Sequence, residues 1–186
     1  MARIPFADED RLADTSRAAL AALPDLGIFR LLANAGPAFP DFIRLTATLW
    51  NDAELSPRRR ELAILLVARL TDCEYEWHQH EEVARLCGIT DAEIGLLRSA
   101  DLAGFDDGER AMLEFVRVTV DRGRASDEHF AVVRGHLTSR EIVELQLIVA
   151  VYAGLAAIMV GLDLELDPAS GASALTRDER GPRLGS

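Results

Sequence analysis

The chain has 186 residues, of which 49% are hydrophobic and 27% are charged. This composition is typical of a globular protein, and the length is sufficient for one domain with a sizeable core. The formal net charge of −11 argues against a surface that binds phosphate groups, so we expect no nucleic-acid partner. The N-terminal sequence lacks a basic start followed by an apolar core, so we expect no secretory signal and a cytoplasmic location.

The first half of the chain has the apolar spacing of helices separated by turns. The first three predicted helices cover residues 8–23, 27–33 and 39–50. Ser56 as N-cap, followed by Pro57 in the first turn, predicts a fourth helix, and the apolar run at 62–70 indicates that this helix is largely buried. We expect the next helix to begin at Thr71, because Thr71 and Glu74 have the spacing of a capping box.

The second half of the chain continues with predicted helices and no predicted strand. Two further capping boxes, Thr90 to Glu93 and Thr138 to Glu141, mark the start of a short helix and of a long final helix. Between them we expect helices at residues 106–120 and 127–135. Because no run alternates in the way that strands require, the sequence predicts an all-α fold, a single-domain helical bundle.

The final predicted helix contains an uncharged stretch, Leu145 to Leu162, that reaches the length of a membrane span. Polar Gln146 and Tyr152 interrupt this stretch and no basic residues flank it, so a buried helix, with no membrane contact, is the favoured interpretation. So long an apolar helix needs covering on every side, which predicts a homo-oligomer. The small, polar residues 168–186 are expected to form a flexible tail.

Residues 61–80 contain the candidate functional side chains. On a helix that begins near Thr71, Cys73, Glu76 and His80 lie at positions i, i+3 and i+7 and project from one face. Seven residues of helix span roughly 10 Å, too far for Cys73 and His80 to touch, so Glu76 could relay between them. Glu61 lies on the preceding helix and can join them if the two helices pack closely.

The spacing of Glu61, Cys73 and His80 resembles the active-site motif of the alkylhydroperoxidase D-like members of the carboxymuconolactone decarboxylase superfamily. Glu76 stands where that motif has a second, resolving cysteine. The resemblance covers residues 28–166 and implies a helical domain at 28–167, preceded by an N-terminal helical segment at 1–27. It also implies an enzyme that acts on a small molecule and assembles as a dimer, trimer or hexamer.

The residue types in this motif allow both thiol and acid–base chemistry. A thiol in the first turn of a helix is favoured as the thiolate, but the acidic residues near Cys73 oppose this. Glu76 lies four residues before His80 and could hold its tautomer, and Glu61 near Glu76 would keep one of the two carboxyls protonated. We expect no cofactor, and no metal, because Cys73 and His80 are too far apart on a straight helix to share one small ion.

Three functions remain open. The preferred one is a cofactor-free enzyme, of the lyase or isomerase type, in which Glu61, Glu76 and His80 move protons on a small organic acid, lactone or enone and Cys73 contacts the substrate. The second is a hydroperoxide reductase with peroxiredoxin activity, in which Cys73 is oxidised and an external thiol completes the cycle. The third is an oligomeric binding protein without turnover.

Overall fold

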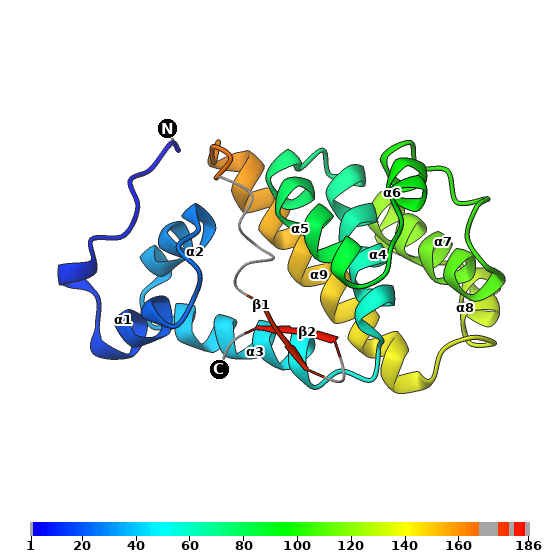
Figure 1. Cartoon of the computed structure of the whole chain (residues 1–186), viewed down its shortest axis with the longest axis horizontal. Coiled ribbons are helices and arrows are strands. Elements are labelled where there is room, and N and C mark those ends of the chain that lie inside the picture. The colour runs from blue at the N-terminus through cyan, green and yellow to red at the C-terminus, as the bar shows by residue number, and fades with distance from the viewer. Residues whose placement is uncertain (1, 168–174, 179–180, 185–186) are drawn as a thin grey trace.

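Helix α4 (Pro57–Leu70) occupies the centre of the fold in the computed structural model, which describes residues 2–167, 175–178 and 181–184. Every residue from Arg60 to Ala68 is buried. The helices that pack around α4 are α5 (Glu74–Leu86), α6 (Asp91–Arg98), α7 (Asp107–Arg122) and α9 (Ser139–Gly161). Figure 1 shows α4 among them. A helix that is buried all round needs neighbours on every side, and these four helices supply them.

The other helices extend the fold at both ends. They are α1 (Asp14–Ala21), α2 (Gly27–Leu32), α3 (Ala38–Asn51) and α8 (Asp127–Val133), with short 3-10 turns at Glu9–Arg11 and Ala33–Ala35. The predicted all-α fold is confirmed by these helices. The first helix begins later than predicted, because Leu12 and Ala13 have extended backbone and separate it from the 3-10 turn.

Three of the predicted helix starts are confirmed by their side-chain hydrogen bonds. Ser56 accepts a hydrogen bond from the amide of Arg59 at 3.3 Å and caps α4. Thr90 caps α6 and Thr138 caps α9, each with the reciprocal glutamate bond of a capping box. These side chains satisfy amides that the first helical turn would otherwise leave without partners.

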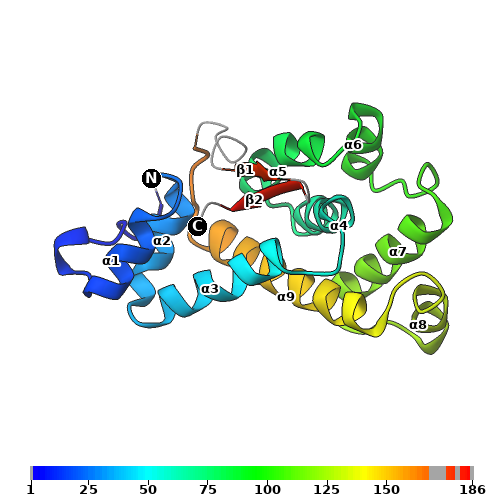
Figure 2. The same cartoon turned by 60° about the horizontal axis from the view of Figure 1, so that its bottom comes forward.

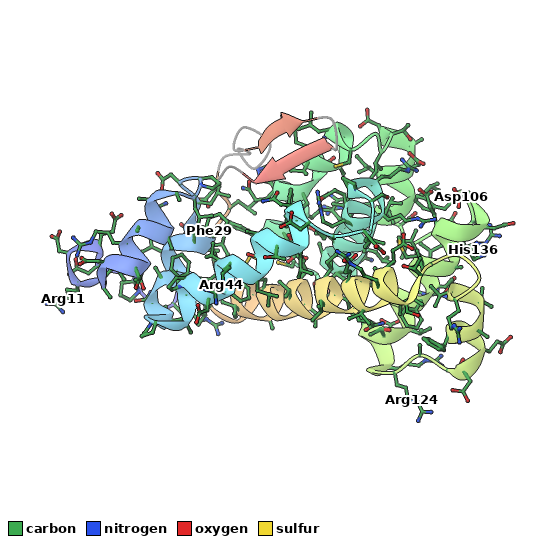
Figure 3. The ribbon with its side chains drawn as sticks, turned by 90° about the horizontal axis from the view of Figure 1, so that it is seen from below. Arg11, Phe29, Arg44, Asp106, Arg124 and His136 are labelled. Atoms are coloured by element: carbon green, nitrogen blue, oxygen red, sulfur yellow. The ribbon has the colours of Figure 1, made fainter. Side chains whose placement is uncertain are left out.

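Residues 2–37, called the N-terminal arm below, contain α1 and α2 and stand at one end of the helical body (Figures 1 and 2). Viewed from below, Arg11 lies at the outer end of the arm, while Asp106 and His136 lie at the opposite end of the molecule (Figure 3). The family-like region that we predict at 28–167 therefore includes the inner part of this arm, α2 and the turn that follows it.

A small set of hydrogen bonds ties the arm to the body. The amide of Gly27 donates to the carboxylate of Asp167 at 2.5 Å, and the amide of Ile28 donates to the hydroxyl of Tyr75 at 3.3 Å. The hydroxyl of Tyr75 in turn donates to Asp167. The start of α2 is thus held jointly by α5 and by the segment that follows α9.

Helix α9 is long and apolar enough to cross a membrane by length and composition, and in the described part of the chain it alone is so. Its inner face packs against α3, α4 and α7, and 44% of its apolar window is buried. Its outer face leaves Val143, Leu147 and Val160 exposed. Homo-oligomerisation stays a prediction, and we expect its contact surface to include these exposed apolar side chains.

A two-stranded antiparallel hairpin follows the helices. It consists of β1 (Leu175–Asp178) and β2 (Gly181–Leu184), and β2 contacts α3 and α5. No strand was expected here, because four residues with a central proline carry too weak a pattern to predict one. The rest of the tail predicted at 168–186 lies outside the described residues.

Candidate active site

A tight turn joins α4 to α5 and folds the two helices against each other. Thr71 ends α4 and donates its hydroxyl to the carbonyl of Val67 at 2.8 Å, and Asp72 adopts left-handed backbone with φ of 51°. Cys73 is therefore the N-cap of α5, which begins at Glu74, and the predicted capping box at Thr71 is wrong. The return of the chain places α5 alongside α4, so side chains of the two helices meet.

The side chains of Glu61 and His80 meet across these two helices. Nδ1 of His80 lies 2.8 Å from Oε2 of Glu61, and Oε1 of Glu61 accepts a hydrogen bond from Nε of Arg60 at 2.9 Å. Glu61 and Arg60 are almost completely buried. The guanidinium of Arg60 also donates to the carbonyl of Trp50 at 2.9 Å and lies 3.9 Å from the centre of the indole ring. Arg60 is thereby fixed in position beside Glu61.

The charge of Glu61 determines which nitrogen of His80 remains for a ligand. Burial opposes ionisation of Glu61, but His80 and Arg60 together outweigh burial and lower its pKa. An ionised Glu61 can only accept hydrogen bonds, so Nδ1 of His80 must carry a proton. Nε2 is then the nitrogen of His80 that can exchange a proton with a substrate.

Glu76 lies near this pair in a different electrostatic state. Its side chain is 2% exposed, and neither carboxyl oxygen has a hydrogen-bond partner among the described residues. Burial, with the neighbouring charge of Glu61 as a second cause, raises the pKa of Glu76 well above its usual value. The two carboxyls therefore differ in charge, with Glu61 ionised and Glu76 protonated. The predicted pairing of Glu76 with His80 is wrong, because His80 pairs with Glu61.

Cys73 lies behind these residues in an apolar cluster with Leu26, Ile28, Ala156 and Met159. Burial raises the pKa of its thiol to about 11, although the amides of Glu76 and Tyr75 point towards the sulfur and oppose this change. At neutral pH the thiol form therefore predominates, and the thiolate is the form that attacks peroxides. The other cysteine, Cys87, ends α5 at its far end, and the two form no disulfide.

A cavity of about 220 Å³ adjoins this site. The polar residues of its wall include Glu76, Gln79 and His80 from α5 and Tyr152 from α9, whereas Glu61 and Cys73 lie outside the wall. The opposite wall is apolar and comes from the N-terminal arm and α3, with residues such as Leu23, Leu26, Phe29, Phe42 and Ile43. The polar end and the apolar wall together form a site for a small molecule.

The structure adds two aromatic side chains and one arginine to the residues predicted from the sequence. Nε1 of Trp50 donates to the hydroxyl of Tyr152 at 2.8 Å, and the Tyr152 ring packs edge-on against His80 with 5.1 Å between centres. Burial, followed by the charge of Glu61, raises the pKa of Tyr152, so its hydroxyl keeps a proton. Arg60 had one signal in the sequence, a charge beside Glu61 at the start of an apolar helix. Trp50 and Tyr152 had none.

Residues 38–117 match the sequence profile of the carboxymuconolactone decarboxylase family. The predicted resemblance is confirmed over this region. The matched residues include Glu61, Cys73, Glu76 and His80, whereas α1, α2 and α9 lie outside the match. A comparison with curated proteins gives no match.

Solved structures with the same fold span most of the chain. An alkylhydroperoxidase AhpD core protein from Ralstonia eutropha, described as peroxidase-related, has a TM-score of 0.78 at 18% identity over 91% of this chain and 94% of its own. A protein of unknown function from Agrobacterium tumefaciens has a TM-score of 0.67 at 23% identity over 73% and 95%. The debrominase Bmp8, solved with 2,3,4-tribromopyrrole, has a TM-score of 0.69 at 16% identity over 89% and 91%. At these identities the likeness shows the shared fold.

Proposed function

We propose that this chain is a cofactor-free enzyme that moves protons on a small lactone, enone or organic acid, in a reaction of the lyase or isomerase type. The observation that carries the proposal is the state of Glu76. A buried carboxyl without partners, on the wall of the same cavity as His80, is costly unless a ligand uses it. A buried polar group without a partner calls for an explanation, and a ligand that pairs with it is the one that we propose for Glu76.

The proposed reaction has two stages, the formation of an enol and its conversion to product, and each stage has two proton transfers. Nε2 of His80 removes a proton from the carbon next to the substrate carbonyl, and the electron pair moves into the carbonyl, whose oxygen takes the proton of Glu76. The resulting enol returns its hydroxyl proton to Glu76. His80 then delivers its proton to another carbon of the conjugated system, and the double bond shifts. No electron leaves or enters, so the reaction needs no redox partner.

Glu61 supports this cycle from behind His80. Its carboxylate holds Nδ1–H and stabilises the imidazolium that forms when Nε2 takes a proton. Arg60 keeps Glu61 ionised throughout, because Arg60 donates to its second oxygen. Cys73 is close to the site through its neighbours Tyr75 and Met159, and in this proposal it contributes shape and not chemistry.

The second candidate is a thiol-dependent hydroperoxide reductase. It is favoured by the position of Cys73 at the start of α5, where two backbone amides point towards the sulfur. Two observations weigh against it: the thiol pKa of about 11, and the presence of Glu76 where a resolving cysteine would stand. An external thiol would have to complete each cycle.

Proton transfer can be measured directly by hydrogen exchange. The purified protein is incubated in D₂O with small lactones and enones, and loss of the proton next to the carbonyl is followed by NMR. We expect Glu76→Gln and His80→Gln to slow exchange by roughly 100-fold or more, and Cys73→Ser to leave it unchanged. Loss of exchange in Cys73→Ser would contradict the proposal. Rapid, thiol-reversible oxidation of Cys73 by a stoichiometric organic hydroperoxide would establish the second candidate instead.

A further inference from the structure

The charges around the cavity restrict the kind of molecule that it can hold. No arginine lies on its wall in the described part of the chain, and the chain contains no lysine. The nearest buried cation, Arg60, already donates to Glu61 and to the carbonyl of Trp50 and lies on the indole ring. The cavity therefore has no arginine or lysine side chain that could pair with a negative charge on a ligand.

The acidic groups near the cavity add a further cost for an anion. Glu61 is ionised behind His80, and its two carboxylate oxygens already pair with Nε of Arg60 and with Nδ1–H of His80. A carboxylate in the cavity would lose its hydration, would meet no arginine, and would lie near the negative charge of Glu61. Burial of an anion without a partner is among the most costly events in a protein interior. An uncharged ligand avoids this cost.

Glu76 and Tyr152, two of the polar residues on the wall, can each donate a hydrogen bond to a carbonyl group. A protonated Glu76 is a hydrogen-bond donor, and the hydroxyl of Tyr152, which accepts from Trp50, keeps its own proton to donate. The rest of the wall is mostly apolar and is built from the N-terminal arm, α3 and the end of α9. The volume of about 220 Å³ lies below the range of roughly 300–1,000 Å³ usual for drug-sized ligands.

We propose that the cavity selects uncharged cyclic carbonyl compounds, lactones or enones with an apolar ring, and rejects carboxylic acids in their ionised form. This inference narrows the substrate class and rests on the proposed function for the role of Glu76. In this proposal the N-terminal arm recognises the apolar ring of the ligand. The N-terminal arm lies outside residues 38–117, which match the family profile.

The test compares two ligands of the same size by isothermal titration calorimetry at neutral pH: the enone 1-acetylcyclohexene and cyclohexene-1-carboxylate. We expect the enone to bind at least about tenfold more tightly than the carboxylate, which corresponds to about 1.4 kcal/mol. Equal or tighter binding of the carboxylate, or binding of neither compound at millimolar concentration, overturns the inference. Binding of the enone without hydrogen exchange would refute the proposed reaction while leaving the proposed selectivity standing.

Variants of the wall identify where the ligand sits and why charge matters. Ala19→Phe fills the cavity from α1 and should abolish binding of the enone, whereas Ala18→Phe, at an exposed neighbour outside the wall, should not. Thr46→Arg places a cation on the wall and should improve the affinity for the carboxylate at least about tenfold. Unchanged carboxylate affinity in a folded Thr46→Arg protein would contradict the electrostatic explanation.

Discussion

Replacing Glu76 with glutamine should stabilise the protein more and more as the pH rises. In the folded chain, burial and the charge of Glu61 raise the pKa of Glu76, whereas in the unfolded chain it is about 4.3. Above that pH, folding requires Glu76 to take up a proton that the unfolded chain lacks. The stability from protonated Glu76 is complete below the unfolded pKa and is lost as the pH rises towards the folded pKa. Glutamine has the shape of the protonated acid and needs no proton.

The magnitude follows from the linkage between proton binding and folding. Between the two pKa values, each pH unit lowers the free energy of unfolding of the wild type by about 1.4 kcal/mol. The full slope applies because Glu76 is 2% exposed. In a chain of this size 1 kcal/mol changes Tm by about 2–4 °C, so the variant should gain about 3–6 °C on the wild type per pH unit. Thermal melts followed by circular dichroism in steps from about pH 4.5 to 7.5 measure this difference.

A matched variant separates this effect from general changes of charge. Glu82 lies on the same helix and is exposed, so Glu82→Gln should keep a nearly constant Tm difference from the wild type over the same range. If the curve for Glu76→Gln also ran parallel to the wild type, Glu76 would be ionised in the folded chain. Glu76 could then not serve as the acid in the proposed mechanism.

Changes at three other positions test the buried pair of Arg60 and Glu61, the stability of the protein at low pH, and the predicted homo-oligomer. Glu61→Gln should lower turnover and reduce the free energy of unfolding in urea by about 3–5 kcal/mol, because Arg60 then loses its buried carboxylate; unchanged activity would remove Glu61 from the mechanism. Arg58 lowers the pKa of Glu93 to about 2. The stability that this ion pair gives is therefore present above the ordinary glutamate pKa and is lost as the pH falls. The Tm difference between wild type and Arg58→Met should accordingly shrink below about pH 4. Leu147→Glu should reduce the mass measured by light scattering, since Leu147 is 40% exposed on the apolar face of α9; an unchanged mass would place the predicted oligomer contact elsewhere.

Helix starts could be predicted where the signal was local. Ser56, Thr90 and Thr138 each cap a helix through a side chain that reaches amides within the same turn. Thr71 has the same spacing but ends a helix, because its hydroxyl bonds back to Val67. A left-handed residue at Asp72 then makes the turn, and aspartate adopts that conformation too seldom for the sequence alone to predict it.

The stripe of Cys73, Glu76 and His80 could be predicted, but the partner of His80 could not. Spacing along one helix placed Glu76 and His80 on one face, and both do lie on the cavity wall. The contact that forms is between helices, from Glu61, and it depends on how closely α4 and α5 pack. The apolar cavity wall from the N-terminal arm could not be predicted either, because it forms only when segments that are far apart in the sequence meet.

Arg60 explains why two neighbouring carboxyls can differ so strongly. Glu61 and Glu76 are both buried, and two buried carboxyls near each other cannot both ionise at low cost. His80 and Arg60 both contact Glu61 and lower its pKa, while neither oxygen of Glu76 has a partner among the described residues. The ionised carboxylate is therefore the one behind His80, and the protonated one is the one that reaches the cavity. In the proposed mechanism this arrangement supplies an acid and a base, and it holds Arg60 beside Glu61 and outside the cavity wall, which is why we propose an uncharged carbonyl compound as the ligand.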